Sequence, residues 1–256
     1  MLLAINCNNT NIKFGVVDGD EVIGEWRQHT SAMRTADEHA VWLFQLMKME
    51  GIDPKSITDA IVASVVPNAN FNLRRLCTRY FNCTPLFLGE PNVVYGIQVK
   101  GAGAGADRIC NSVGASILFP KTPVLVVDFG TSTNFDVIDE EGSYCGGAIA
   151  PGINLSIEAL HNATALLPRI IVEKPKQVIG VNTVACMHSG VFWGYIGLIE
   201  GLVKRIKDEF GRPMKVVATG GLAPVFEGST DVVDQTVVDI TARGLIEIWK
   251  RSKKAA

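Results

Sequence analysis

Short apolar segments that end in polar turns alternate with helical patterns along most of this chain. Residues 1–7 and 124–129 read as apolar strands, and each is followed by a polar turn and a second strand that continues to Asp18 or Asp139. The run 60–66 is wholly apolar apart from Ser64 and is closed by Pro67, which is typical of a buried parallel strand. Strands that alternate with helices predict an α/β layered fold.

The helical segments carry their own start and stop signals. Thr35 with Glu38 three residues later predicts a capping box at the start of a helix, and residues 70–81 predict another helix. A longer helix is predicted to end at Gly211. Its apolar positions recur every three or four residues and form one stripe, at Phe192, Ile196, Ile199, Val203, Ile206 and Phe210. The stripe favours a core-facing helix, with a dimer seam as the alternative.

The two strand–turn–strand segments resemble each other in chemistry. Each places an amide or a carboxylate at a strand end, followed by backbone N–H groups and hydroxyls that suit a phosphate. Two copies in one chain predict a nucleotide held in a cleft between duplicated domains, which we place at residues 1–106 and 107–256. A helix starting near Asp107 is expected to join them.

Composition excludes several classes of protein. The formal net charge is −2, so no broad basic surface indicates nucleic acid, and no apolar run reaches the roughly 20 residues of a membrane span. The six cysteines are scattered without a metal-binding pattern, which favours a reducing, cytoplasmic environment. The basic run 250–254 is expected to be a frayed, solvated tail.

Three short segments are candidates for chemistry. Asp107 beside Arg108 could accept a hydroxyl proton while the arginine holds an anion, although an ordinary helix cap is the simpler explanation of that pair alone. Asp128 ends an apolar strand just before Gly130, where the backbone can approach a phosphate. Gly220 and Gly221 follow another strand and suit either a tight turn or the close approach of a purine base.

Many ordered motifs together resemble those of the type III pantothenate kinases, members of the acetate and sugar kinase, Hsp70 and actin superfamily. The resemblance covers nearly the whole chain. Its motifs are Asn9–Asn11, Arg34–Glu38, Ser64–Pro67, Tyr95–Gly96, Gly105–Arg108, Asp128–Thr131, Gly146–Gly152, Leu166–Pro168, Asn182–Thr183, Ser189–Gly190, Gly194–Tyr195 and Thr219–Ala223.

This resemblance implies two actin-like (ribonuclease H-like) α/β domains and the ATP-dependent phosphorylation of pantothenate, the first step of coenzyme A biosynthesis. It implies Asp107 as the catalytic base, Asp128 as the ligand of a monovalent cation (K⁺ or NH₄⁺), Mg²⁺ accompanying ATP, and a homodimer. The implied pantothenate pocket consists of Tyr95, Gly105, Ala106, Arg108 and Thr183. The expected ATP-binding residues are Asn6, Asn8, Asn9, Thr10, Asn11, Lys13, Gly130, Thr131, Ser132, Gly220 and Gly221.

The chain departs from the family pattern Asp-x-Gly-Asn-Thr at its first turn. Asn6 replaces the aspartate and keeps its shape, but it loses the charge that attracts Mg²⁺ or its water shell. Asn8 replaces the glycine, and asparagine tolerates the left-handed backbone better than other side chains do. The stretch 98–104 is shorter than in the family and lacks the proline before Gly105, so we expect an altered pocket rim near Tyr95.

Three interpretations follow from these departures. The favoured one is a working pantothenate kinase with weakened or rearranged metal binding. The second is a catalytically poor relative that binds nucleotide or pantothenate in a regulatory role. The third is the same fold acting on another small hydroxylated acid.

Overall fold

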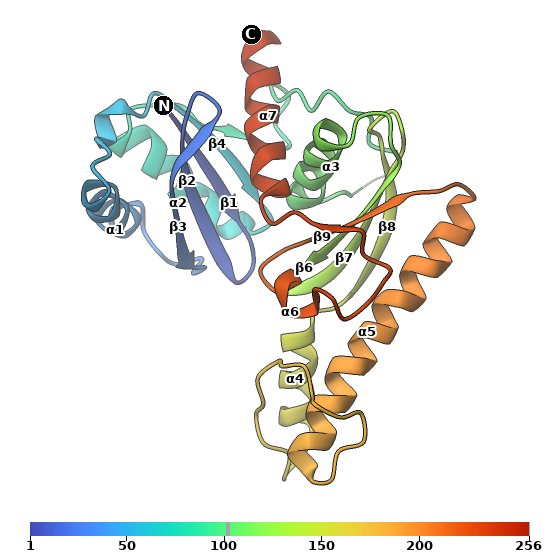
Figure 1. Cartoon of the computed structure of the whole chain (residues 1–256). Helices are drawn as coiled ribbons and strands as arrows, with labels where there is room; N and C mark the ends of the chain where they lie inside the picture. The colour runs from blue at the N-terminus through green and yellow to red at the C-terminus, as the bar shows by residue number, and fades with distance from the viewer. Residues whose placement is uncertain (101–102, 256) are drawn as a thin grey trace. The chain divides into compact units, whose positions relative to one another are not determined.

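The computed structural model describes residues 1–100 and 103–255, and these form two compact units (Figure 1). The first unit contains residues 1–97, 103–114 and 241–255, and the second contains residues 98–100 and 115–240. The expected boundary lay between residues 106 and 107, whereas in this division residues 107–114 and 241–255 also belong to the first unit.

A five-stranded sheet with the order β3-β2-β1-β4-β5 forms the centre of the first unit. Its strands are β1 (Leu2–Cys7), β2 (Asn11–Asp18), β3 (Glu21–His29), β4 (Asp59–Ser64) and β5 (Leu86–Phe87). The strands β1, β2 and β3 are antiparallel neighbours, whereas β4 pairs with β1 in parallel. Because β1 and β4 are central and covered on both faces, they are almost continuously apolar, as the sequence predicted.

Helices cover both faces of this first sheet. One face packs against α1 (Ala36–Met49) and α2 (Pro67–Tyr80), with Leu43 and Leu73 fully buried between the layers. The other face packs against the start of α3 (Ala106–Leu118) and against α7 (Ile240–Ala255). A short 3-10 helix, η1 (Pro54–Ser56), precedes β4. The predicted capping box is present, since Thr35 caps α1 and Glu38 reaches back to it.

The second unit repeats the arrangement with the order β10-β9-β6-β7-β8. Its strands are β6 (Val124–Phe129), β7 (Ser132–Ile138), β8 (Tyr144–Pro151), β9 (Lys215–Thr219) and β10 (Gln235–Thr236). The helices α4 (Ile153–Asn162), α5 (Thr183–Phe210) and α6 (Ala223–Phe226) cover one face. The predicted apolar stripe of α5 faces this core, from Phe192 to Val203, which confirms the core-facing interpretation.

The two sheets match strand for strand, with β1 corresponding to β6, β2 to β7 and β4 to β9. Asn6 is the fifth residue of β1 and Asp128 the fifth residue of β6. The predicted duplication is therefore confirmed, and the two polar strand ends occupy equivalent positions in their own units.

Several elements differ from the expectation or were not expected. The basic run 250–254 is part of α7 rather than a frayed tail, and β8, α4 and β10 had no prediction. All six cysteines are free among the described residues; four are buried, whereas Cys145 is half-buried and Cys186 is exposed. Among the described residues, no helix is long and apolar enough to cross a membrane.

Candidate functional site

The first hairpin turn, between β1 and β2, presents polar groups at the end of a buried strand. The Asn8 N–H donates to the Asn11 carbonyl (3.0 Å), and the Thr30 hydroxyl donates to the Asn8 carbonyl (2.6 Å). These bonds fix the turn and leave Asn9 and Thr10 exposed at its tip. Positive φ angles outside glycine occur, among the described residues, only at Asn82 and Lys121, so Asn8 does not need the left-handed backbone that its replacement of glycine suggested.

A polar row crosses the first sheet beside this turn. Asn6 lies directly opposite Lys13 on β2 and Ala63 on β4, and Lys13 lies opposite Arg27 on β3. Residues directly opposite one another share a sheet face, so an amide and two cations stand side by side. Across residues 1–100 and 103–255, neither cationic side chain forms a hydrogen bond or an ion pair. This row is able to attract an anion.

Two oxygen atoms of the first hairpin are buried without a hydrogen-bond partner, the Oδ1 atoms of Asn6 and Asn8. A buried unpaired acceptor is costly unless it receives a hydrogen bond, so these oxygens suit donors supplied by a ligand. Waters bound to Mg²⁺ are such donors, because Mg²⁺ in phosphate sites keeps several of its waters. The hairpin therefore fits a hydrated cation through neutral oxygens rather than through a carboxylate.

The second hairpin turn, between β6 and β7, is shorter than the first, and its backbone packs against Gly152 and Gly220. The Gly130 N–H donates to the Ser132 carbonyl (3.0 Å), and the Gly152 N–H donates to the Thr131 carbonyl (3.2 Å). A Cβ at Gly152 would lie 2.3 Å from the Thr131 carbonyl oxygen, and a Cβ at Gly220 would lie 2.5 Å from the Phe129 carbonyl oxygen. Glycine at these two positions lets the neighbouring backbone close on the turn.

Asp128 stands in a polar row equivalent to that of Asn6. It lies opposite Thr219 on β9 and Asn134 on β7, and it interacts with other groups. The Thr219 hydroxyl is buried without a partner. Asp128 Oδ1 approaches Gly220 so closely that a Cβ there would lie 2.6 Å from it. A carboxylate and an unpaired hydroxyl on one face are oxygen donors that suit a cation.

The candidate base Asp107 lies in the first turn of α3, half-buried, directly after Gly105 and Ala106. Its Oδ1 accepts a hydrogen bond from the Arg108 N–H (2.8 Å). A Cβ at Gly105 would lie 2.9 Å from Asp107 Oδ1, so glycine leaves that side of the carboxylate uncovered. A carboxylate at a helix N-terminus is also favoured by the helix dipole.

Two further predicted pocket residues have different surroundings. Tyr95 is half-buried in an irregular segment, and its hydroxyl accepts a hydrogen bond from the Gly89 N–H (2.8 Å). Burial raises the pKa of Tyr95, so its hydroxyl stays protonated at neutral pH. Thr183 belongs to the second unit, where it is exposed in the first turn of α5 beside the capping residue Asn182.

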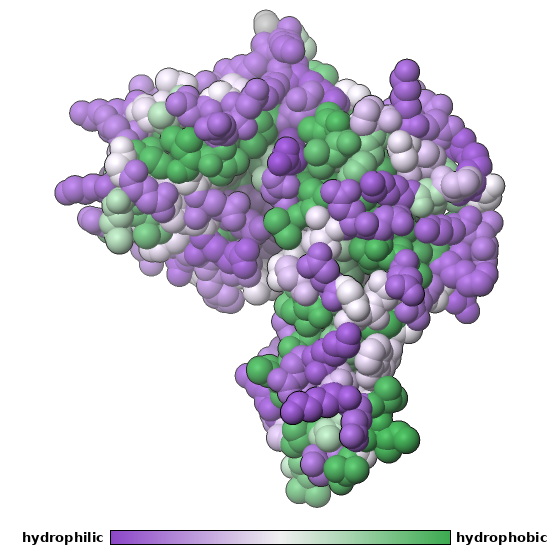
Figure 2. Space-filling view, viewed as in Figure 1, coloured by the Kyte–Doolittle hydropathy of each residue, from purple (hydrophilic) through white to green (hydrophobic). Residues whose placement is uncertain are grey.

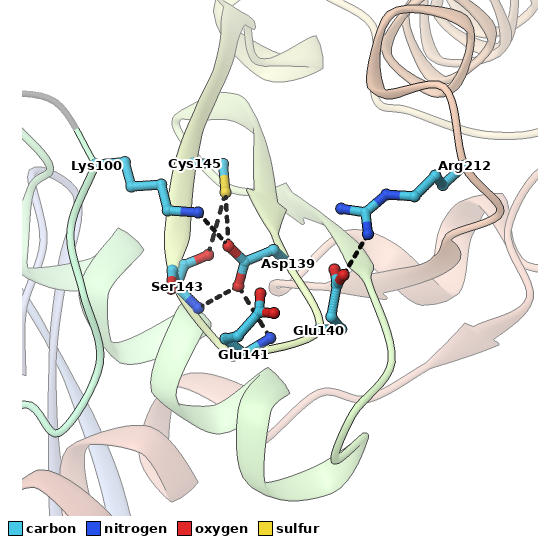
Figure 3. Close-up of polar contacts among 7 residues, drawn as sticks. All are labelled: Lys100, Asp139, Glu140, Glu141, Ser143, Cys145 and Arg212. Atoms are coloured by element: carbon cyan, nitrogen blue, oxygen red, sulfur yellow. Dashed lines mark hydrogen bonds and ion pairs between the residues drawn. The ribbon is translucent and has the colours of Figure 1, made fainter.

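A carboxylate in the second unit, Asp139, holds the segment 98–100 to β8 (Figure 3). Its oxygens accept hydrogen bonds from Lys100 Nζ (2.5 Å) and from the Ser143 N–H (2.8 Å), and Figure 3 shows Cys145 pointing toward it. Burial would raise the pKa of Asp139, but the hydrogen bonds from Lys100 and Ser143 lower it overall. All of these contacts are internal to the unit, so we assign the cluster a structural role. Residues 101 and 102 of the predicted pocket rim lie outside the described residues.

Cavities and metal-ligand clusters do not single out another site. A shallow groove of about 620 Å³ lies on α1, between Asp37 and Leu46, and contains no predicted site residue. A smaller cavity of about 100 Å³ lies beside β9 in the second unit, between Phe129 and Phe226. Within the described part of the chain, no three His, Cys, Asp or Glu side chains gather as metal ligands.

Two residues beside the candidate sites, Arg27 and Thr219, were not predicted as site residues from the sequence. Each lies beside its site because of the register in which its strand pairs with the neighbouring strand. Arg27 joins the polar row of Asn6 only because β3 pairs with β2 at that position. Thr219 was part of a motif, but its buried hydroxyl beside Asp128 follows from the parallel pairing of β9 with β6. The only signal in the sequence was the alternation of residues along each strand. Alternation predicts the sheet face on which a side chain lies, but it does not predict which residue of the neighbouring strand lies beside it.

Two relatives match nearly the whole length of this chain. The type III pantothenate kinase from Paramagnetospirillum magneticum is 55% identical over 255 residues, covering 98% of each chain. The type III pantothenate kinase from Rhodospirillum rubrum is 55% identical over 256 residues, covering 99% of each.

Solved structures show a similar fold at low sequence identity. The activator of 2-hydroxyisocaproyl-CoA dehydratase from Clostridium difficile, with bound ADPNP, has a TM-score of 0.55 at 12% identity, covering 99% of this chain and 96% of its own. A polyphosphate/ATP-glucomannokinase from Arthrobacter has a TM-score of 0.51 at 17% identity, covering 98% of each. These two likenesses concern the fold alone, and they agree with the expected α/β class.

The model of one protein family matches residues 2–205, and that family is described as type III pantothenate kinase. Taken with the full-length relatives at 55% identity, the match shows that this chain belongs to the type III pantothenate kinase family.

Proposed function

We propose that this chain transfers the terminal phosphoryl group of ATP to the primary hydroxyl of pantothenate, with Asp107 as the base. Membership of the family supports this reaction, which begins coenzyme A biosynthesis. The observation that carries the assignment of the base is the position of Asp107 at the start of α3, where the Arg108 N–H holds its Oδ1 and Gly105 places no Cβ against that oxygen. A carboxylate held in this way can accept the proton of an incoming hydroxyl.

On the acceptor side, each residue has one task in the proposed mechanism. Arg108 faces the carboxylate of pantothenate, while Tyr95, Gly105, Ala106 and Thr183 line the pocket. Asp107 takes the hydroxyl proton as the oxygen attacks the γ-phosphorus and the bond to ADP breaks. Positioning and charge neutralisation are the main requirements of phosphoryl transfer, so one carboxylate base is sufficient.

On the nucleotide side, each hairpin offers backbone N–H groups and hydroxyls that suit a phosphate, and the glycines Gly220 and Gly221 allow the close approach of the nucleotide. The predicted residues of the first turn are Asn6, Asn8, Asn9, Thr10, Asn11 and Lys13, and those of the second are Gly130, Thr131 and Ser132. Bound Mg²⁺ supplies charge neutralisation on the phosphates. The unpaired oxygens of Asn6 and Asn8 support contact with its waters.

Because Asn6 carries no charge, the first hairpin offers the metal no carboxylate. The cations Lys13 and Arg27 stand in the same row and add positive charge for the phosphates. In the proposed mechanism Asp128 holds a monovalent cation, K⁺ or NH₄⁺, and the unpaired Thr219 hydroxyl beside it supports that role.

We further propose that the chain forms a homodimer through an apolar patch on the second unit. From α4 to the start of α5 (residues 153–184), many large apolar side chains are exposed, and Figure 2 shows hydrophobic residues on this part of the surface. They are Leu155, Leu160, Leu166, Ile171, Val178, Ile179, Val181 and Val184. Soluble monomers rarely expose contiguous apolar patches of this kind, and Thr183 lies within this segment.

The activity is tested by release of ADP in the presence of ATP, Mg²⁺ and K⁺, with and without pantothenate. We expect pantothenate-dependent turnover in the parent enzyme and a loss of about 10²- to 10⁴-fold in kcat for Asp107→Asn. Pantothenate binding, measured by calorimetry, is expected to persist in that variant. Undiminished turnover of Asp107→Asn would remove Asp107 from the mechanism, and tighter binding of another hydroxylated acid would overturn pantothenate as the substrate.

The dimer is tested by sedimentation equilibrium of Leu166→Asp, since Leu166 is 92% exposed in the patch. The matched control is Met33→Asp, which places the same charge at an 85% exposed methionine of the first unit. We expect the first variant to dissociate and the control to remain dimeric. A parent protein that is monomeric at micromolar concentration would contradict the proposal.

A further inference from the structure

The last turns of α7 are fastened to the first unit by four consecutive polar side chains. Lys250 pairs with Asp20 after β2, and Lys253 pairs with Asp59 at the start of β4. Between them, the buried hydroxyl of Ser252 accepts a hydrogen bond from the Val94 N–H (2.9 Å). A run that the sequence suggested to be a solvated tail is therefore part of the structure around residues 94–96.

Arg251 makes the most specific of these contacts. Its Nη1 donates to the Tyr95 carbonyl oxygen (2.6 Å), and its Nε donates to the carboxylate of Glu247 one turn earlier (2.8 Å). The Arg251 side chain is only 24% exposed. Hydrogen bonds from a guanidinium are charge-assisted and directional, so Glu247 orients the group that holds the Tyr95 carbonyl.

The residue after Tyr95 is shaped to receive this guanidinium. Gly96 has φ +66°, and a Cβ built there would lie 2.7 Å from Arg251 Nη1 and 2.8 Å from Arg251 Cδ. A side chain at this position would meet both a strained backbone and the arginine. The turn at Tyr95–Gly96 and the side chain of Arg251 therefore fit each other closely.

Residues 93–96 belong to no helix or strand, so no ladder of backbone hydrogen bonds fixes their position. Among the described residues, this segment is held by four hydrogen bonds. They join the Val93 N–H to the Glu90 carbonyl, the Val94 N–H to Ser252, the Tyr95 carbonyl to Arg251, and the Gly89 N–H to the Tyr95 hydroxyl. Two of these four bonds come from α7, and one of those two is to Tyr95 itself. The position of Tyr95 thus depends on the last turns of the chain.

We propose that Arg251 is a positioning residue for the acceptor, which fixes the Tyr95–Gly96 turn and thereby sets the affinity of the enzyme for pantothenate. The inference rests on the proposed function, in which Tyr95 lines the pantothenate pocket. Arg251 itself acts through the Tyr95 carbonyl and performs no chemical step. Loss of this anchor frees the turn that forms one wall of the proposed pocket, so pantothenate binds less tightly while the reacting groups stay in place.

The test compares Arg251→Gln with Arg251→Lys, measuring kcat and KM for both substrates. We expect Arg251→Gln to raise the KM for pantothenate about tenfold, with kcat and the KM for ATP within twofold of the parent. Arg251→Lys keeps a cation that reaches the carbonyl and should recover part of the affinity. The matched control is Lys250→Gln, which removes a neighbouring cation on the same helix and should leave both KM values unchanged.

Gly96→Ala provides an independent variant, because it disturbs the contact between the turn and Arg251 without removing the guanidinium. It is expected to raise the KM for pantothenate in the same selective way. If Arg251 had only a structural role, Arg251→Gln would lower the melting temperature and the fraction of active enzyme. The apparent kcat would then fall while both KM values stayed unchanged, and that result would overturn the inference. A parent enzyme without pantothenate-dependent turnover would instead overturn the proposed function, and this inference with it.

Discussion

The substitution Gly220→Ala should destabilise the second unit strongly, while the same change at the next residue should not. Gly220 has φ +91°, which costs a residue with a Cβ about 1–2 kcal/mol. Its Cβ would lie 2.5 Å from the Phe129 carbonyl oxygen, 2.6 Å from Asp128 Oδ1 and 2.7 Å from the Phe129 nitrogen. Two of these atoms are backbone and cannot rotate away, so overpacking adds about 1–3 kcal/mol.

The expected loss in the free energy of unfolding is therefore about 3 kcal/mol, which corresponds to a fall in melting temperature of about 6–12 °C for a chain of this size. Gly221→Ala is the control, since a Cβ there meets no atom within 4 Å and its φ lies outside the left-handed region. That change should be neutral or stabilising by about 0.4–1 kcal/mol, because alanine restricts the unfolded chain.

The assay is thermal and urea unfolding followed by circular dichroism, with both variants measured beside the parent. Gly220→Ala should also weaken ATP binding, because relief of the contact moves the backbone of residues 128–129. Equal stability of the two variants would refute the argument, since it would mean that the hairpin does not pack on Gly220 as described.

Two further predictions concern metal dependence and pH. Asn6→Asp places a carboxylate opposite Lys13 and should lower the Mg²⁺ concentration at half-maximal rate about tenfold, which corresponds to about 1.4 kcal/mol of binding free energy. If the dependence of rate on Mg²⁺ is the same in the variant and the parent, the metal is bound elsewhere. Burial, with the positive charge of Arg34, lowers the pKa of His39 from 6.5 to about 4. Between these values the unfolded chain binds more protons than the folded one, so the free energy of unfolding should fall by about 2–3 kcal/mol as the pH drops from 6.5 to 4. The urea midpoint should therefore fall between pH 6.5 and 4 in the parent, and it should fall less steeply in His39→Gln. Equal pH dependence in the two proteins would refute this role of His39.

The local elements were largely predictable, since each depends on neighbours in sequence. The capping box at Thr35 fixes the start of α1, and the apolar spacing from Phe192 onward fixes the buried face of α5. The apolar run before Pro67 identified β4 as a buried strand. Motifs of this kind also predicted the family, because many short segments in a fixed order are hard to match by chance.

The end of the chain shows where prediction failed. The run 250–254 has the composition of a solvated tail, and nothing in it indicates that Asp20, Asp59 and the Tyr95 carbonyl lie opposite its side chains. Those partners are between 156 and 230 residues away in sequence. Contacts at such separations follow from topology, which local patterns do not encode.

Local patterns were enough to predict the duplicated strand–turn–strand segments, the position of Asp107 at a helix start, and the loss of charge at Asn6. Which side chains stand beside these groups follows from contacts between distant segments. Pairing in register placed Lys13 and Arg27 in the row of Asn6, and Thr219 in the row of Asp128. Folding of α7 onto the first unit placed Arg251 against Tyr95. The physical reason is that alternation along a strand or helix gives each side chain a face, whereas its partner on that face is set by backbone pairing and packing between distant segments.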